Sequence, residues 1–381
     1  MALDRFEVRI SIQKVLLGLV LVIVPLSLVG LYLTLHSNSS LDASIGTHLK
    51  DMAQMYSNDV SHELNDRVAA VKLIAADPGV VEAVATANRS YENQSETAIN
   101  DKLDKADKAW SGPEGAAKVK TLLESKSSET LRHYHDMVPQ ILTVTVTDIR
   151  GVPVAATAKP SRYRLTTWNP WQAVYAGGKG DVSISNMLYD EPTKSYFVNL
   201  GVPVTDSKTT NLAGVAVASV DISPILANFQ QESGGNTGVK ALLVDDNGTV
   251  VAGPKTDIFA RVHSDEFDAV RDAMGTAEGR QTGYAMASLR RGGQIVGFGD
   301  TGLQKTYKNF AWTVLVSEDE RVATGPIRVL SQFAILMVIL ALFMVTLLAV
   351  YYALHRKQQF ADIEAGLAGQ HTLSSPPPHA V

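Results

Sequence analysis

The stretch ILTVTVTDIRGVPV, residues 141–154, decides the fold of this chain. From Ile141 to Asp148 apolar and polar side chains alternate and β-branched residues dominate, which is the pattern of a half-buried β-strand. The three residues after Asp148 end in a glycine and predict a turn. A second strand is expected from Val152 to Thr157, so the stretch predicts an antiparallel hairpin.

The sequence on both sides of this hairpin predicts one α+β module, at about residues 77–222, which we call the distal module. Residues 80–135 are mostly polar and are predicted to be helical. After the hairpin come three further runs rich in β-branched residues, and turn signals such as Asp190-Glu191-Pro192-Thr193 separate them. These predicted strands cover residues 182–187, 196–204 and 213–220. The module is therefore a set of helices followed by about five antiparallel strands.

A shorter version of the same pattern follows in residues 223–320, which we call the proximal module. Residues 222–231 predict a connecting helix, and Asp245-Asp246-Asn247-Gly248 predicts a hairpin turn. The remaining predicted elements are a helix at 264–274 and strands at 239–244, 249–252, 284–289, 294–298 and 312–317. The two modules share one order of strand, Asp-containing turn, strand, helix or loop, and further strands.

A long helix is predicted before both modules, from residue 37 to residue 76. Apolar residues recur there at steps of three or four, the helix period, until Asp77-Pro78-Gly79 ends the pattern. The apolar stripe consists of Leu41, Ile45, Leu49, Met52, Tyr56, Val60, Leu64, Val68, Val71 and Ile74. This stripe packs only on the chain's own modules, or part of it also pairs with a second subunit. We expect a homodimer.

Two long apolar segments, Val15–Leu35 and Val329–Leu354, enclose the long helix and the two modules. Each is long enough to cross a hydrocarbon core of roughly 30 Å as a helix. For the first segment a cleaved signal peptide is the alternative, but the apolar core is longer than such peptides have and a poor cleavage site follows it. Basic residues lie mainly outside the segments, at Arg9 and Lys14 and at Arg356, which predicts that both termini are cytoplasmic.

The composition fits an extracytoplasmic domain without nucleic-acid chemistry. The formal net charge is −5, and no cluster of Lys and Arg stands out, which argues against a nucleic-acid partner. The chain has no cysteine, so disulfides, thiolate metal sites and thiol nucleophiles are excluded. Large extracellular animal domains often carry disulfides, and this chain has no cysteine to form them. We therefore expect a bacterial inner membrane protein with its main domain in the periplasm.

At this point the chain resembles the double Cache sensor domains of bacterial receptors, in which a helix emerging from the membrane leads into two PAS-like modules. The segments that carry the resemblance, in chain order, are Val146–Val154, Leu200–Val204, Gly214–Ile222, Val244–Val251 and Trp312–Glu318. The order and spacing of these segments make the match specific, and it spans about residues 40–325.

The resemblance implies a fold class and a domain plan. The expected fold is α+β: a long N-terminal helix plus two PAS-like antiparallel-sheet modules, flanked by two transmembrane helices. The expected parts are a cytoplasmic N-terminus, a transmembrane helix, a periplasmic sensor, a second transmembrane helix and a cytoplasmic tail, at residues 1–14, 15–36, 37–326, 329–354 and 355–381.

The resemblance also implies a ligand site in the distal module. Amino-acid-binding members use an Arg for a carboxylate, acidic groups for an ammonium and aromatic rings as walls. The residues at the matching positions are Arg162, Arg164, Trp168, Trp171, Tyr189, Asp190 and Asp221. The family's tight Arg-x-Trp-Tyr spacing is absent, because Gln172 follows Trp171, so an amino acid, an organic acid or an amine are all left open as the ligand. Alternatively, both tryptophans belong to the core and Asp190 is only a turn residue.

Catalysis is not expected. His133 and His135 lack a surrounding carboxylate pattern, residues 176–180 lack the Walker spacing, and no Gly-x-Ser-x-Gly elbow occurs. We therefore expect no enzyme, no cofactor and no metal, and a small-molecule sensor. The alternative is a structural or assembly protein whose outer domain binds another protein. The tail 355–381 is too short for the cytoplasmic signalling domain that receptors of this family carry. We therefore expect either that a separate protein transmits the signal or that the chain is a truncated receptor.

Overall fold

The computed structural model describes most of the chain, namely residues 12–207, 209–230, 238–256, 260–276, 279–289, 292–308, 310–323, 332–333, 335–351 and 354. The chain divides into two compact units, one made of Met1–Ser44 with Ala323–Val381 and the other of Ile45–Val322. The polar tail 355–381 lies outside the described residues. Within the part of the chain that is described, no helix combines the length and the apolar character needed to span a membrane.

The unit that contains both termini is helical where it is described. Helix α1 (Ile12–Ala75) begins there and includes Pro25 in its interior. Residues 335–351 are also helical. The Ser27 hydroxyl donates a hydrogen bond to the backbone carbonyl of Met337 at 3.3 Å. Large apolar side chains of this unit are exposed, for example Leu21 at 70 % and Leu342 at 63 %.

The distal module is a helical layer against an antiparallel sheet. Its helices are α2 (Pro78–Arg89), α3 (Glu96–Ala109), α4 (Pro113–Leu123), α5 (Lys126–Met137) and α6 (Asn169–Tyr175). Its strands are β1 (Ile141–Asp148), β2 (Pro153–Ala156), β3 (Ser183–Ile184), β4 (Leu188–Asp190), β5 (Ser195–Thr205) and β6 (Leu212–Asp221). The strand order is β2-β1-β6-β5-β3, and β4 also pairs with β5.

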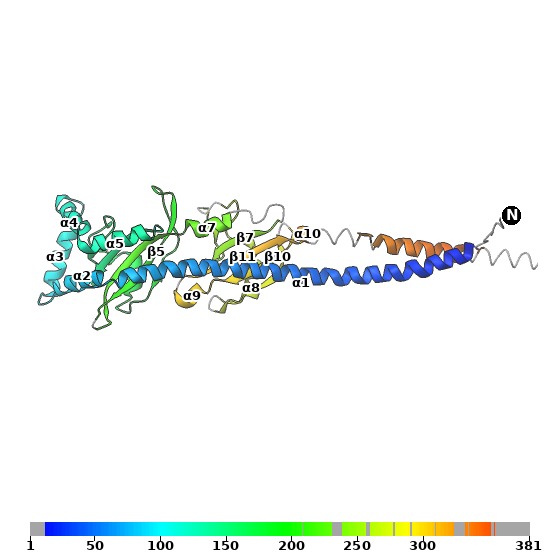
Figure 1. Ribbon diagram of the computed structural model, residues 1–381, viewed down its shortest axis with the longest axis horizontal. Helices are drawn as coiled ribbons and strands as arrows, with labels where there is room; N and C mark the ends of the chain where they lie inside the picture. The colour runs from blue at the N-terminus through cyan, green and yellow to red at the C-terminus, as the bar shows by residue number, and fades with distance from the viewer. Residues whose placement is uncertain are drawn as a thin grey trace, which may run out of the picture. The chain divides into compact units, whose positions relative to one another are not determined.

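The proximal module repeats this sheet. Its helices are α7 (Ser223–Gln230), α8 (Asp265–Met274), α9 (Leu303–Thr306) and α10 (Glu320–Ala323). Its strands are β7 (Lys240–Asp245), β8 (Val250–Ala252), β9 (Gly283–Leu289), β10 (Gly292–Asp300) and β11 (Trp312–Asp319). The strand order is β8-β7-β11-β10-β9. Figure 1 shows both sheets beside α1, with α3 and α4 at the far end of the distal module.

Most predicted elements are confirmed, and four short ones were missed. The predicted helix 37–76 and the predicted strands of both modules are present within a few residues. No helix was predicted around Trp171, but the segment forms α6, which begins beside Pro170 and ends at a left-handed Ala176. Strand β4 and helices α9 and α10 were also not predicted. The sequence Arg-Arg-Gly-Gly at 290–293 predicts a further turn, and Arg290 and Arg291 lie outside the described residues.

The apolar stripe of α1 is buried inside a single chain. From Leu49 to Ile74 its members join one continuous core that includes side chains from both sheets. The proximal sheet approaches the helix most closely, because a Cβ at Gly297 would lie 2.4 Å from the backbone carbon of Leu49. The Ser57 hydroxyl also donates to the carbonyl of Gly299 at 2.8 Å. The sequence pattern that predicted the helix is thus explained by packing within the chain.

Candidate functional site

The distal module contains a cleft beside the start of α6, which we call the distal cleft. It encloses about 660 Å³, a volume within the range of small-molecule sites. Its lining side chains come from the start of α6 and the residues before it, from β3, from the segment between β3 and β4, from the start of β4 and from the middle of β5. They are Thr167, Trp168, Asn169, Pro170, Ala173, Ser183, Ile184, Ser185, Asn186, Leu188 and Asn199. The cleft lies on the face of the sheet that α6 covers in part.

Asn199 forms a fixed polar floor for this cleft. Only 5 % of the residue is exposed, and its side-chain oxygen accepts a hydrogen bond from the Ser219 hydroxyl at 2.8 Å. The Asn199 backbone N–H donates to the Ser185 hydroxyl at 2.9 Å, and its carbonyl accepts from the Ser185 N–H at 2.9 Å. Because β5 is paired on both sides, the floor is set by backbone register and not by a mobile loop.

The position of α6 depends on a glycine beneath it. A Cβ at Gly201 would lie 2.4 Å from Val174 Cγ2 and 3.1 Å from the carbonyl oxygen of Pro170. Glycine at this position therefore lets α6 pack directly on β5, with Val174 fully buried. The helix covers one part of the sheet face, and the adjoining part stays open as the distal cleft.

The cleft offers hydrogen bonds and apolar contact but no formal charge. Its polar groups are hydroxyls and amides, and Trp168, Ile184 and Leu188 supply apolar surface. Among the described residues that line it, none carries a charged side chain. Transfer of an ionised ligand group into such a site would lose hydration without gaining a counter-charge. The geometry therefore favours a neutral ligand.

The two predicted tryptophans occupy different environments. Trp168 lies partly buried at the distal cleft. Trp171 is 3 % exposed, its ring nitrogen donates to the Thr147 hydroxyl at 2.8 Å, and its ring stacks on Tyr175 with centroids 4.7 Å apart. Trp171 belongs to a small buried cluster with Val174, so its packing explains its presence without a ligand.

The two predicted arginines face other protein groups. Arg162 donates to the Thr167 hydroxyl at 3.1 Å, and Arg164 lies 3.7 Å from the Asp104 carboxylate. Arg164 and Trp171 line a second cleft of about 350 Å³, near the C-terminal end of α6. The Nε atom of Arg164 is buried there, and no acceptor among the described residues reaches it. Of the predicted site residues, Arg164 therefore lines a cleft and has a side-chain nitrogen without a hydrogen-bond acceptor among the described residues.

The predicted residues Tyr189, Asp190 and Asp221 lie where β5 begins and β6 ends, away from the cleft that Arg164 lines. The ring of Tyr189 contacts that of Tyr196, with centroids 4.9 Å apart. The Asp190 carboxylate accepts from the Thr193 hydroxyl at 2.6 Å, as expected of a turn residue, and Asp221 accepts from the Ser223 N–H at 2.8 Å. These three residues are not among those lining the distal cleft. The structure thus distributes the predicted set over three places, and a ligand-binding role for it stays a prediction.

Comparison with known proteins agrees with this architecture. A double Cache family model, described as Cache domain, matches residues 37–327. The chain belongs to the Cache domain family. No curated protein is significantly similar to it.

Among solved structures, the ligand-binding domain of the Pseudomonas aeruginosa amino acid chemoreceptor PctC with GABA has 15 % identity and a TM-score of 0.47, over 72 % of this chain and 100 % of that chain. That of the Campylobacter jejuni chemoreceptor Tlp3 with 4-methylisoleucine has 13 % identity and a TM-score of 0.47, over 75 % and 95 % of the two chains. That of the Pseudomonas fluorescens chemoreceptor CtaA with L-isoleucine has 14 % identity and a TM-score of 0.43, over 76 % and 98 %.

The polar floor of this Cache domain was missed in the sequence, although a signal was present. Asn199 interrupts an apolar run between Val198 and Leu200. In a strand, the alternation of side chains places Asn199 on the face opposite to these two neighbours, which join the core. A buried polar residue at such a position indicates a hydrogen-bonded site, but the pattern does not say what lies above it.

The first hairpin of the Cache domain carries a buried carboxylate. Asp148 is fully buried and accepts hydrogen bonds from the Tyr91 hydroxyl at 2.6 Å and from the N–H groups of Arg150 and Val152 at 2.8 and 2.9 Å. Burial raises the pKa of Asp148, although these hydrogen bonds oppose the shift. Burial and then the charge of Asp148 also raise the pKa of Tyr91. This group stabilises the hairpin and lies outside the distal cleft.

Proposed function

We propose that this chain is a membrane-anchored extracytoplasmic sensor whose distal module binds a small neutral molecule in the distal cleft. The observation that carries this proposal is the cleft itself, a site of about 660 Å³ with a fixed polar floor in a Cache domain. The sensor domains of this family bind small ligands. The solved domains named above are bound to amino acids or related compounds. In this chain the uncharged lining supports a different ligand class.

The neutral ligand follows from the cost of burying charge. An amino acid carries two charges, and each needs a counter-charge or several hydrogen bonds when water is removed. Ser183, Ser185 and Asn199 offer hydrogen bonds only. A ligand with hydroxyl, amide or carbonyl groups and one flat apolar side matches this set, because Trp168 supplies an apolar ring at the rim.

A ligand screen on the purified full chain tests the proposal. Neutral compounds (nucleosides, purine bases, sugars and amides) are compared with amino acids, organic acids and amines by thermal shift, and hits are titrated calorimetrically. We expect a neutral hit whose dissociation constant rises at least about tenfold in Trp168→Ala, because stacking on an aromatic ring is lost. The control is Lys105→Ala, at an exposed position of α3 that does not line the distal cleft, and its affinity should not change.

Two results would contradict the neutral-ligand proposal. A charged hit that binds normally to Trp168→Ala but is lost in Asp190→Ala would move the site to the residues predicted from the family resemblance. Failure of every compound across the screen would favour the alternative in which the outer domain binds another protein.

The anchoring segments are part of the proposal. We place Val15–Leu35 and Val329–Leu354 in the bacterial inner membrane, with both termini cytoplasmic and residues 37–326 in the periplasm. The length and apolar composition of the segments support this, and so does the exposure of side chains such as Leu21 and Leu342. Protease added outside spheroplasts should cleave between the segments and spare both ends. Cleavage at the tail would contradict this orientation.

A homodimer is also part of the proposal, but through a different face of α1 than the apolar stripe. The stripe is buried within the chain, whereas Met55 and Leu73 on the helix are 50 % and 65 % exposed. Single cysteines at these two positions, in a chain without other cysteines, should crosslink between subunits in membranes. A cysteine in place of the exposed Ser207, distant in sequence from α1, is the control. Equal, weak crosslinking at all three positions would indicate a monomer.

A further inference from the structure

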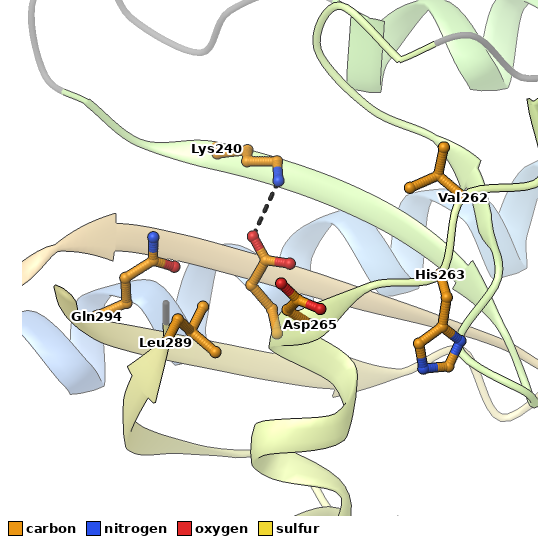
Figure 2. Close-up of a pocket in the computed structure, with 7 residues that line it drawn as sticks. Lys240, Val262, His263, Asp265, Leu289 and Gln294 are labelled. Atoms are coloured by element: carbon orange, nitrogen blue, oxygen red, sulfur yellow. Dashed lines mark hydrogen bonds and ion pairs between the residues drawn. The ribbon is translucent and has the colours of Figure 1, made fainter. Parts of the chain in front are cut away.

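The proximal module has a cleft of its own, which we call the proximal cleft. It encloses about 370 Å³ beside the start of α8. Its lining residues are Lys240, Val262, His263, Asp265, Glu266, Leu289 and Gln294. They come from the first residue of β7, the segment before α8, the first turn of α8, the end of β9 and the start of β10, and Figure 2 labels all of them except Glu266.

Like the distal cleft, the proximal cleft lies beside the start of the helix that packs on the sheet of its module. In both modules one helix lies between the second strand and the next strand of the sheet, α6 in one and α8 in the other. The strand orders correspond, with β5 and β10 in the same position. Each cleft lies where that helix begins and the adjoining strands remain uncovered. The two clefts do not coincide in the repeat, because Gln294 pairs with Asp319 as Phe197 pairs with Asp221, and Phe197 is not among the residues that line the distal cleft.

The proximal cleft is charged. The Lys240 ammonium donates to the Glu266 carboxylate at 2.9 Å, and the Ser264 hydroxyl donates to the other carboxylate oxygen at 2.9 Å. Burial alone would raise the pKa of Glu266, but the hydrogen bond and charge of Lys240 lower it below its ordinary value. Glu266 is therefore a carboxylate at neutral pH. Asp265 adds a second carboxylate, so acidic groups outnumber the ammonium at this cleft.

Gln294 leaves a hydrogen-bond acceptor unused. Its side-chain oxygen is buried, and no donor among the described residues reaches it. An unsatisfied buried carbonyl costs about 1–3 kcal/mol, which a ligand donor recovers when the Gln294 amide turns its oxygen toward the cleft. In Figure 2 the amide of Gln294 lies on the same side of the cleft as Lys240, above Leu289. The site thus needs a donor and carries an excess of negative charge, and Leu289 and Val262 supply apolar surface.

We propose that the proximal cleft binds a small aliphatic primary amine in its ammonium form. The ammonium donates to the Gln294 side-chain oxygen and to the acidic groups at the start of α8, and the carbon chain lies against Leu289 and Val262. Lys240 opposes this ligand, because two ammonium groups repel each other in one site. The site is separate from the distal cleft and its ligand, so either one can fail without the other.

Three probes of similar shape test the charge preference. n-Pentylamine, pentanamide and pentanoate are titrated onto the full chain at pH 7.5, with binding followed by ligand-observed NMR. We expect the amine to bind more tightly than the other two. Glu266→Gln and Gln294→Leu should each weaken amine binding at least about tenfold, since each removes an interaction with the ammonium. Lys240→Met should strengthen amine binding several-fold, because the competing cation is gone.

The controls separate this site from the distal cleft and from general damage. Trp168→Ala should leave amine binding unchanged, and the melting temperature of each variant without ligand verifies that it is folded. Preferential binding of pentanoate, lost in Lys240→Met, would overturn the proposal in favour of an anion site. Absence of binding by all three probes, or amine binding that neither Glu266→Gln nor Gln294→Leu weakens, would also overturn it.

Discussion

The distal and proximal modules have the same strand order, yet they meet α1 in different ways. In the distal sheet the contact is made by large side chains, such as Val198, Leu200 and Val202, which share a core with the helix. In the proximal sheet two glycines, Gly297 and Gly299, bring the strand backbone against the helix backbone. The distal contact can adjust by rotamer changes, whereas at Gly297 the proximal strand meets the backbone of α1, and there is no side chain at that point to move aside.

The strand registers show that the two clefts lie at different places along the repeat. Asp148 and Asp245 each end the first strand of a module, which aligns Thr143 with Lys240. The same pairing aligns Phe197 with Gln294, because their strand partners are Asp221 and Asp319. Lys240 and Gln294 line the proximal cleft, whereas neither Thr143 nor Phe197 lines the distal one. The comparison teaches that the same strand order can carry clefts at different places and with different chemistry.

The largest expected effect concerns the glycine contact. Gly297→Val should lower the free energy of unfolding by about 4 kcal/mol or more, because the new side chain meets backbone atoms that cannot rotate away. Denaturant unfolding of the purified chain measures this. The control is Gly279→Ala, where the nearest atom to a new Cβ is 3.8 Å away. Equal stability of the two variants would mean that the sheet and α1 separate easily.

A smaller loss of stability is expected from substitutions in the first hairpin of each module, and it should differ between the two hairpins. Asp148→Ala leaves two N–H groups and the Tyr91 hydroxyl without an acceptor in a buried site, at a cost of about 2–3 kcal/mol. Asp245 accepts from the N–H groups of Asn247 and Thr249 in a more accessible turn. Asp245→Ala should therefore cost about 1 kcal/mol. Unfolding free energies of the two variants that were equal, or in reverse order, would contradict this difference in burial.

The smallest expected effect is a pH dependence carried by Asp148. Its folded pKa lies above its unfolded pKa, because burial disfavours the charge. Its contribution to stability is therefore complete below the unfolded pKa and is lost as pH rises through the folded pKa. Relative to the natural chain, Asp148→Asn should gain stability as the pH rises above about 4, the ordinary pKa of an unfolded aspartate.

A second variant sharpens this test of pH dependence. Tyr91→Phe removes a hydrogen bond that lowers the pKa of Asp148, so it should make the loss of stability with rising pH steeper than in the natural chain. Denaturation at several pH values measures both variants. A constant difference between Asp148→Asn and the natural chain would show that Asp148 has the same pKa in both states.

The sequence by itself determined the periodic elements and their order. The alternation in ILTVTVTD predicted β1, the apolar stripe predicted the helix from residue 37, and the Asp245–Gly248 turn predicted the second hairpin. These predictions are correct because each pattern depends on which face of a single helix or strand is buried, and that pattern is local in the sequence. They also indicated a repeat of two modules, and the resemblance of five segments to double Cache domains was confirmed by the family match over residues 37–327.

The tertiary structure decided the sites. Trp168 and Trp171 are close in sequence and pack with the same buried cluster, yet Trp168 at the start of α6 also lines the distal cleft and Trp171 does not. The distal floor at Asn199 and the proximal pair Lys240–Glu266 each combine residues from separate strands or from a strand and a helix. Strand register and helix position bring these groups together, and both depend on long-range packing that no local pattern contains.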